Sequence, residues 1–200
     1  MTQLHHIDVN DANNLNHLWA SPYHCAMSEQ CVPRIKLVSI GDSMTGKSCL
    51  VKRFCEKKFY DRFKPTIGID YGTRKFTFKQ RKICVDFWDM SGHHEFEEIR
   101  CEFYGDTQIC FFVFDCSDKE SFANLQNWID ETRKYKMPKD AVKYVVCNKV
   151  DSRYRVISAE QANEWCEEHS SECLRYHETS SKSGRGVQEL FASVFEEFLK

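Results

Sequence analysis

The sequence of 200 residues has no apolar run that approaches the length of a membrane-spanning helix. Its longest run covers residues 109–114, whereas a helix across a bilayer needs about 20 apolar residues. The N-terminus also lacks the charged and then apolar stretches of a secretory signal. A formal net charge of -2 excludes the basic field on which non-specific nucleic-acid binding depends. We therefore expect a soluble cytoplasmic protein that has no nucleic-acid partner.

Signals for covalent lipids are missing as well. The second residue is Thr2 rather than the glycine that N-myristoylation requires, and the C-terminal residues Phe198-Leu199-Lys200 offer no cysteine for prenylation. We expect no intrinsic membrane anchor.

The 11 cysteines are an odd number and occur singly, without a C-x₂-C pair. This pattern favours reduced thiols over a disulfide framework. A zinc site at Cys25 and Cys31, near His17 and His24, is a weaker alternative because the usual spacing of metal ligands is missing.

Two regions of different character follow each other along the chain. Residues 1–33 are rich in Asn, His, Asp and Ser and show no sustained hydrophobic period, which predicts a flexible tail. In residues 34–200, short apolar runs alternate with helix-like stretches, which predicts one α/β domain with helices on both faces of a sheet. The predicted strands cover residues 34–40, 73–78, 83–88, 110–115, 142–147 and 174–179.

Local signals mark three of the helices and one hairpin. Ser117 with Glu120, and Ser158 with Gln161, have the spacing of capping boxes. Charged residues around 75–82 are typical of an exposed edge hairpin. An apolar stripe with steps of three and four predicts a last helix packed on the sheet, formed by Val187, Leu190, Phe191, Val194, Phe195, Phe198 and Leu199.

A glycine-rich motif lies between the first predicted strand and a helical pattern. Residues 41–48 fit G-x-x-x-x-G-K-[ST] in the context that this motif requires. In such a loop, backbone N–H groups surround a β-phosphate, the lysine bridges β- and γ-oxygens, and the serine hydroxyl can bind Mg²⁺. The predicted phosphate-binding residues are Gly41, Asp42, Ser43, Met44, Thr45, Gly46, Lys47, Ser48 and Cys49, with Lys47 also acting in catalysis.

The base-reading motif Asn148-Lys149-Val150-Asp151 follows another strand. Ligands meet an open α/β sheet at this end of its strands. An aspartate there can accept hydrogen bonds from both N1–H and N2–H₂ of guanine, donors that adenine does not offer at those positions. The motif therefore favours GTP and GDP over adenine nucleotides, because ATP would leave the carboxylate unpaired.

Three further residues have the chemistry to contact Mg²⁺ and a γ-phosphate. Asp89 ends the third predicted strand and is predicted to hold Mg²⁺ through water. The N–H of Gly92 can approach the γ-phosphate, and the hydroxyl of Thr66 can sense the metal and that phosphate together. Ser48, Thr66 and Asp89 are thus the predicted metal set.

With these motifs assembled, residues 34–200 resemble the Ras superfamily. Gly41-Asp42-Ser43, Trp88-Asp89 and Glu178-Thr179-Ser180 look most like its Rab branch. Residues 55–59, 66–72, 89–93 and 102–104 are similar to the Rab-like GTPases that often carry a C-terminal J domain. No His-Pro-Asp tripeptide occurs, so we expect the GTPase unit without a J domain.

The resemblance implies a P-loop NTPase fold, a three-layer sandwich with a six-stranded, mostly parallel sheet, one antiparallel edge strand and five helices. It implies a first switch at residues 63–69 and a second at 92–100. It also places Phe59 near the guanine and the loop of Ser180, Ser181 and Lys182 at the guanine oxygen, with Ser181 where the family has alanine.

The main departure from the superfamily is His93, which stands where most members have the glutamine that orients the attacking water. Imidazole differs from an amide in reach and changes protonation near neutral pH, so we expect slow intrinsic hydrolysis. The resemblance implies that the catalytic residues are Lys47, Thr66, Gly92 and His93. A non-hydrolysing GTP-binding adaptor, controlled by nucleotide exchange or by partners, is the alternative.

The resemblance also implies partners and a cellular role. We expect an exchange factor, a GTPase-activating protein and effectors, which would connect a monomeric switch to signal transduction and vesicle trafficking. Without an anchor of its own, the protein would reach a membrane through a protein partner.

Overall fold

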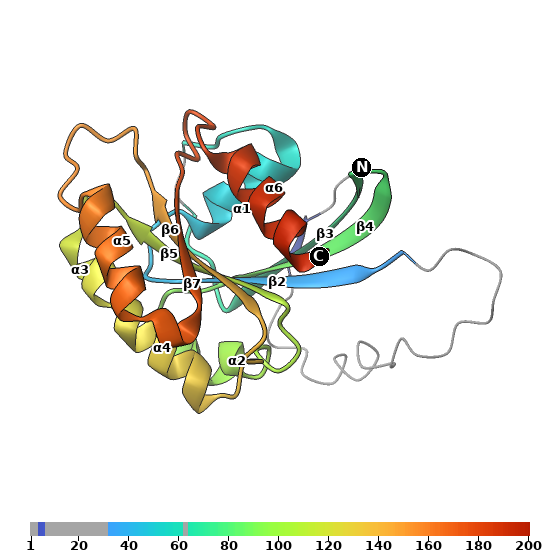
Figure 1. Cartoon of the computed structure of the whole chain (residues 1–200), viewed down its shortest axis with the longest axis horizontal. Coiled ribbons are helices and arrows are strands. Elements are labelled where there is room, and N and C mark those ends of the chain that lie inside the picture. The colour runs from blue at the N-terminus through green and yellow to red at the C-terminus, as the bar shows by residue number, and fades with distance from the viewer. Residues whose placement is uncertain (1–3, 7–31, 62–63) are drawn as a thin grey trace.

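The structure is a computed structural model that describes residues 4–6, 32–61 and 64–200. Its centre is a seven-stranded sheet in the order β1-β3-β4-β2-β5-β6-β7 (Figure 1). The strands β2, β4, β5, β6 and β7 are parallel, and β3 pairs antiparallel with β4. The bounds are β1 Leu4–His6, β2 Arg34–Ile40, β3 Ile69–Phe78, β4 Arg81–Met90, β5 Ile109–Asp115, β6 Val142–Asn148 and β7 Leu174–Glu178.

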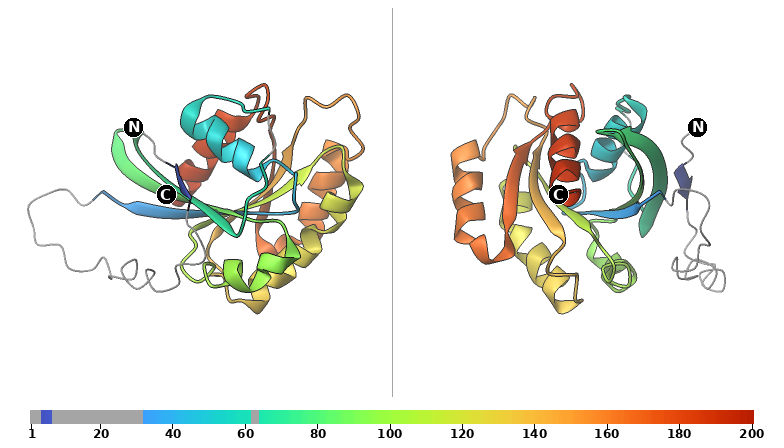
Figure 2. Two further views of the ribbon diagram at one scale, coloured as in Figure 1. Left: turned by 180° about the vertical axis from the view of Figure 1, so that it is seen from behind. Right: turned by 45° about the vertical axis from the view of Figure 1, so that its right-hand side comes forward.

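Helices cover both faces of this sheet (Figures 1 and 2). One face carries α1 (Lys47–Glu56) and α6 (Val187–Phe198). The other carries α2 (Glu97–Cys101), α3 (Lys119–Ala123), α4 (Leu125–Lys134) and α5 (Ala159–Glu168), with the short 3₁₀ turns η2 (His94–Phe96) and η3 (Ser170–Glu172). Since α3 and α4 meet at Asn124, they correspond to one predicted helix. The three-layer α/β fold is confirmed, with β2 to β7 as the six predicted strands and β1 as a seventh that was not predicted.

The central strand β5 shows how the sequence divides the core. All seven of its residues are buried, because β2 and β6 flank it and helices cover both of its faces. Alternate side chains enter different layers: Phe111 and Val113 pack with α1 and α6, whereas Phe112 and Phe114 pack with α4 and α5. The strand therefore ends in a fixed position between two packed layers.

The structure corrects two local predictions. The strand predicted from residue 73 begins at Ile69, because the pairing with β4 extends to Met90. The helix predicted to be capped by Ser117 is instead capped by Asp118, whose side chain accepts from the N–H of Glu120, while the Ser117 hydroxyl donates to Asp115 at 2.6 Å. The capping box of Ser158 with Gln161 is confirmed, as is the last helix.

The N-terminal region is described only in part. Residues 4–6 form β1, which pairs antiparallel with β3 in the register Leu4 to Gly72 and His6 to Asp70. The tail predicted for residues 1–33 otherwise stays a prediction, and Cys25, Cys31 and the neighbouring histidines lie outside the described residues. Of the helices in the described part of the chain, none is both long and apolar enough to span a bilayer.

Candidate functional site

A cavity of about 770 Å³ opens at the carboxyl ends of the central parallel strands. Segments far apart in the sequence line it: the glycine-rich loop, residues 58–61, residues 64–67, residues 91–96 and the segments at the ends of β5, β6 and β7. This is where an open α/β sheet binds ligands. The predicted residues on its wall are Ser43, Met44, Gly46, Lys47, Ser48, Cys49, Phe59, Thr66, Gly92, His93, Asn148, Lys149, Asp151, Ser181 and Lys182.

The remaining predicted residues lie just behind this wall. Gly41, Asp42 and Thr45 form the back of the glycine-rich loop, and Asp89 and Ser180 are buried beneath the cavity. Their contacts, described below, hold the wall residues in place.

The two loop glycines occupy positions that no other residue would fit. Gly41 has φ 138°, and a Cβ there would lie 2.1 Å from the carbonyl oxygen of Val113. Gly46 caps α1 with φ 92°, and a Cβ there would lie 2.4 Å from Nδ2 of Asn148. The loop can therefore bend closely enough to point the N-terminus of α1 into the cavity, an arrangement suited to an anion.

Lys47 begins α1 and spans the loop from inside. Its ammonium donates to the carbonyl oxygens of Gly41 at 2.8 Å and Asp42 at 2.7 Å. Burial lowers the pKa of Lys47 to about 8, against the opposite pull of Asp89 and Asp42. Because desolvation disfavours the charged ammonium, an anionic ligand nearby would stabilise it strongly.

The carboxylate of Asp42 faces away from the cavity. It accepts from Nε1 of Trp128 at 2.7 Å and from Nδ2 of Asn124 at 2.7 Å. Asp42 therefore anchors the glycine-rich loop to the start of α4 and leaves phosphate contacts to the main chain.

Ser48, Thr66 and Asp89 meet as a cluster of oxygen atoms. The hydroxyls of Ser48 and Thr66 lie 3.1 Å apart, and the Ser48 hydroxyl donates to Asp89. Thr66 Oγ1 is 3.5 Å from Asp89, and Ser39 on β2 donates to the other carboxylate oxygen at 3.0 Å. Burial raises the pKa of Asp89, while Lys47 and the two serines lower it. Hard oxygen donors of this kind suit Mg²⁺, so the residues fit the predicted metal.

Asn148 connects three parts of the site, although it was predicted as a base-binding residue. It is 1% exposed, and its Nδ2 donates to the carbonyl oxygen of Thr45 at 2.9 Å. Its Oδ1 accepts from the hydroxyl of Thr179 at 3.2 Å and from the N–H of Ser181 at 3.2 Å. Asn148 thus ties the glycine-rich loop to the loop after β7.

The exposed carboxylate of Asp151 is held in a fixed orientation. It accepts from the hydroxyl of Ser180 at 2.6 Å, and that hydroxyl accepts from the N–H of Ser183 at 3.0 Å. Lys149 has the left-handed φ of 62° and pairs with Asp115 at 2.6 Å. Asp151 and Lys149 of this motif therefore both line the cavity, each held by a neighbouring side chain.

Gly92 packs directly against the glycine-rich loop. A Cβ on Gly92 would lie 2.3 Å from the backbone nitrogen of Ser43 and 2.6 Å from the carbonyl oxygen of Gly41. The next residue, His93, has a side chain that is 54% exposed, with Nδ1 3.8 Å from Glu95 and the ring stacked on His94. Its imidazole therefore stands at the mouth of the cavity in contact with water.

Several residues of the site were missed by sequence reasoning. Asp115 ends the buried strand β5 and pairs with Lys149, and the rule that parallel strands carry ligands at their carboxyl ends could have found it. Ser39 and Arg100 gave no such signal. Ser39 acts through Asp89, and Arg100 acts through Glu131 and the backbone of His93, so both roles depend on contacts that form only in the folded chain.

Comparison with known proteins identifies the family. A model of the Ras family matches residues 36–200. The chain belongs to the Ras family. Its curated relatives include DnaJ homolog subfamily C member 27-B of Xenopus laevis, 41% identical over 170 residues, an alignment that covers 81% of this chain and 60% of the relative. DnaJ homolog subfamily C member 27 is 42% identical in Danio rerio and 40% identical in Homo sapiens, with the same coverage.

The Ras family consists of small GTP-binding switches that act as GTPases, and this chain is one of its members. The resemblance to Rab-like GTPases that often carry a J domain is confirmed, since these relatives are named DnaJ homologs. The chain spans 60% of the length of the curated relatives that it matches.

Proposed function

We propose that this Ras-family chain binds GTP or GDP with Mg²⁺, hydrolyses GTP slowly and presents surfaces whose shape depends on the nucleotide. The observation that carries this proposal is the convergence on one cavity of the glycine-rich loop, the Ser48–Thr66 hydroxyl pair and the carboxylate of Asp151. Each element suits a different part of a guanine nucleotide with its metal.

The base end of the cavity supports guanine as the ligand. The fixed carboxylate of Asp151 can accept from N1–H and N2–H₂ of guanine, and Lys182 and Phe59 line the same cavity. Adenine would leave that carboxylate without donors, which reduces affinity by orders of magnitude in sites of this kind.

The phosphate end supports a triphosphate with a divalent cation. Lys47 and the N-terminus of α1 supply positive charge, while Ser48 and Thr66 are the hydroxyls that would hold the ion, with Asp89 acting through water. Mg²⁺ bound there would neutralise charge on the phosphate oxygens. Thr66 would join the ordered switch only when the γ-phosphate is present, and Gly92 would contribute its N–H.

Hydrolysis would depend on His93. A neutral imidazole can accept a proton or a hydrogen bond from water, but the exposed ring must turn toward the phosphate to do so. Small GTPases that receive an arginine finger from a partner protein turn over slowly on their own, so we expect slow turnover until a GTPase-activating protein binds.

An aromatic surface beside both switches supports effector binding. Tyr71, Trp88 and Phe103 are half-buried. The ring centroid of Trp88 lies 4.8 Å from that of Tyr71 and 4.9 Å from that of Phe103. Ile67, just after Thr66, is 53% exposed. This surface runs from the strand after the first switch to the helix of the second, so a change in either switch would alter it.

The exposed position of His93 also favours a second candidate, the non-hydrolysing adaptor. In that case exchange factors and effectors would control a protein that remains loaded with GTP. Both versions act as a monomer in the cytoplasm and reach membranes through a protein partner, with a role in signal transduction or vesicle trafficking.

Single-turnover hydrolysis of γ-labelled GTP in Mg²⁺ separates these candidates. We expect slow release of phosphate by the native chain, on the order of 10⁻⁴ per second or below, and faster release by His93→Gln. Asp151→Asn should lose GTP binding. The matched control is Asp140→Asn, which should keep it, because Asp140 is exposed and lies before β6, at the end of the strand opposite to Asp151. GTP that stays bound and intact for many hours in the native chain, with Asp151→Asn still unable to bind, would establish the adaptor instead.

A further inference from the structure

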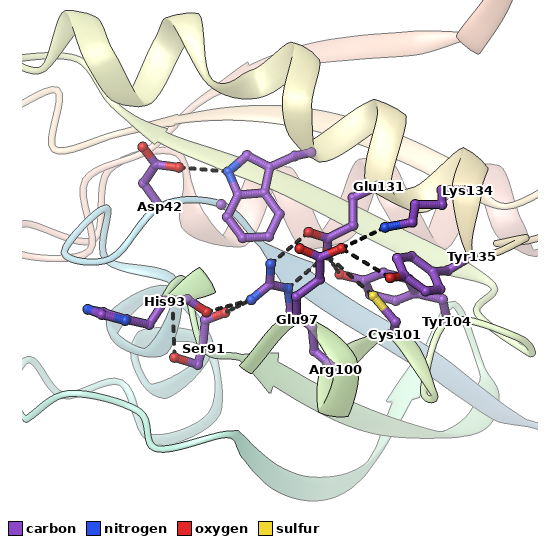
Figure 3. Close-up of polar contacts among 12 residues, drawn as sticks. Asp42, Ser91, His93, Glu97, Arg100, Cys101, Tyr104, Glu131, Lys134 and Tyr135 are labelled. Carbon is purple, nitrogen blue, oxygen red and sulfur yellow. Dashed lines mark hydrogen bonds and ion pairs between the residues drawn. The ribbon is translucent and has the colours of Figure 1, made fainter. Parts of the chain in front are cut away.

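The buried side chain of Arg100 holds the backbone of the second switch. Arg100 lies in the last turn of α2, and its side chain is 3% exposed. Its Nη1 donates to the carbonyl oxygen of His93 at 2.7 Å and lies 3.5 Å from that of Ser91 (Figure 3). The main chain on both sides of Gly92 is therefore attached to one guanidinium group.

The same guanidinium is fixed to α4. Its Nε and Nη2 donate to the two carboxylate oxygens of Glu131 at 2.7 and 2.6 Å. The hydroxyl of Tyr104 donates to Glu131 at 2.6 Å (Figure 3). Because both charged groups are withdrawn from water and every nitrogen of Arg100 has a partner, the guanidinium has one defined position.

The face of α4 that carries Glu131 also holds the glycine-rich loop. Trp128 lies one helical turn before Glu131, and its ring centroid is 4.6 Å from the guanidinium carbon of Arg100. The indole N–H of Trp128 donates to Asp42. One side of α4 thus sets the positions of the phosphate loop and of the second switch relative to each other.

We propose that Arg100 is a positioning residue for hydrolysis, which fixes the peptide of His93 through its carbonyl oxygen and so holds Gly92 against the phosphate loop and the imidazole at the mouth of the cavity. This inference rests on the proposed function, in which those two residues act on GTP. Glu131 acts through Arg100, because it fixes the guanidinium in the orientation that reaches both carbonyl groups.

The surface offers a matched control for this buried pair. Lys134 on α4 pairs with Glu97 on α2 at 3.0 Å, so it joins the same two helices as Arg100 and Glu131. The Lys134 side chain is 63% exposed, however, and exposed ion pairs contribute little. Lys134→Gln should therefore leave the second switch in place.

Hydrogen–deuterium exchange of the purified full chain tests the attachment without any nucleotide. Arg100→Gln should raise the exchange rates of the amides in residues 92–96 by about tenfold or more, because hydrogen bonds to a charged donor are lost. Lys134→Gln should change them by less than about twofold. Equal exchange in Arg100→Gln and the native chain would overturn the proposal.

A double variant separates positioning from the simple cost of an unpaired buried charge. Arg100→Gln leaves Glu131 charged and without its partner, whereas Arg100→Gln with Glu131→Gln removes both charges. We expect the double variant to regain thermal stability but to keep the fast exchange in residues 92–96. Recovery of slow exchange together with stability would show that Arg100 has only a structural role.

Nucleotide assays complete the test. Arg100→Gln should bind fluorescent GDP within about threefold of the native affinity, since the base and β-phosphate contacts remain, while single-turnover hydrolysis falls by about tenfold. Native hydrolysis in a variant whose second switch exchanges rapidly would overturn the positioning role. Failure of the native chain to bind guanine nucleotides would refute the proposed function and its hydrolytic consequence, while the exchange data would still decide whether Arg100 holds the switch.

Discussion

Replacing Asn148 by alanine should destabilise the nucleotide-free protein, even though the residue belongs to the base-reading motif. Asn148 is 1% exposed and donates to the carbonyl oxygen of Thr45 at 2.9 Å. It accepts from the hydroxyl of Thr179 at 3.2 Å and from the N–H and the hydroxyl of Ser181 at 3.2 and 3.1 Å. Four hydrogen bonds at about 0.5–1.5 kcal/mol each predict a loss of about 2–4 kcal/mol, moderated by water that enters from the cavity.

Urea unfolding of the nucleotide-free protein measures this loss. The matched control is Asn163→Ala on the exposed face of α5, where the side chain donates to the carbonyl oxygen of Ala159, and we expect a change within about 0.5 kcal/mol. Asn148→Asp should also destabilise, because a second oxygen would then face the Thr45 carbonyl. If Asn148→Ala weakens GDP binding but leaves unfolding unchanged, Asn148 acts on the base alone, and the connection between the loops contributes nothing.

Four further predictions concern the phosphate end of the site. Between pH 8 and 10, nucleotide binding should take up a proton and weaken as the pH rises, because burial lowers the pKa of Lys47 to about 8 and a bound phosphate raises it again. Calorimetry in buffers of different ionisation enthalpy measures the number of protons taken up. An uptake near zero at pH 9 would contradict the prediction. Over the same window the nucleotide-free fold should gain stability with pH, since the unfolded lysine, with its usual pKa of 10.5, keeps the proton that the folded lysine has lost. Gly92→Ala should slow hydrolysis while GDP still binds, because its Cβ would collide with the backbone of Ser43 and force the second switch away; native hydrolysis by Gly92→Ala would refute this contact. Ser39→Ala should reduce Mg²⁺ affinity by about tenfold or more, since Ser39 orients Asp89, and the Mg²⁺ dependence of GDP release would reveal it; an unchanged dependence would exclude the effect.

Much of the site was predictable because its motifs are local. The motif at residues 41–48 is defined by its own spacing, by the strand before it and by the helix after it. That spacing predicts both the bend at Gly46 and the position of Lys47. Asp151 was predictable in the same way, because it follows a strand whose apolar residues mark it as central. The carboxyl ends of neighbouring parallel strands then bring these motifs together.

The contacts that hold the motifs in place were not predictable. Asp42 was assigned to phosphate binding from its place in the loop, yet its carboxylate faces Trp128 more than 80 positions along the chain. The hydrogen bond from Arg100 to the His93 backbone depends on where α4 lies, and no local pattern encodes that position. The early start of β3 was missed because Asp70 and Tyr71 interrupt the apolar alternation, although both pair with β4.

Competition for the nucleotide site tests the central claim most directly. Native protein loaded with fluorescent GDP in Mg²⁺, and Asp151→Asn loaded with fluorescent xanthosine diphosphate, would each be challenged with GTP, ATP and xanthosine triphosphate. The account predicts displacement by GTP at concentrations far below those of ATP, and a preference of Asp151→Asn for xanthosine triphosphate, whose C2 carbonyl can accept from the new amide. Equal displacement by ATP and GTP, or a native preference retained in Asp151→Asn, would contradict the assignment of this cavity as a guanine-nucleotide site.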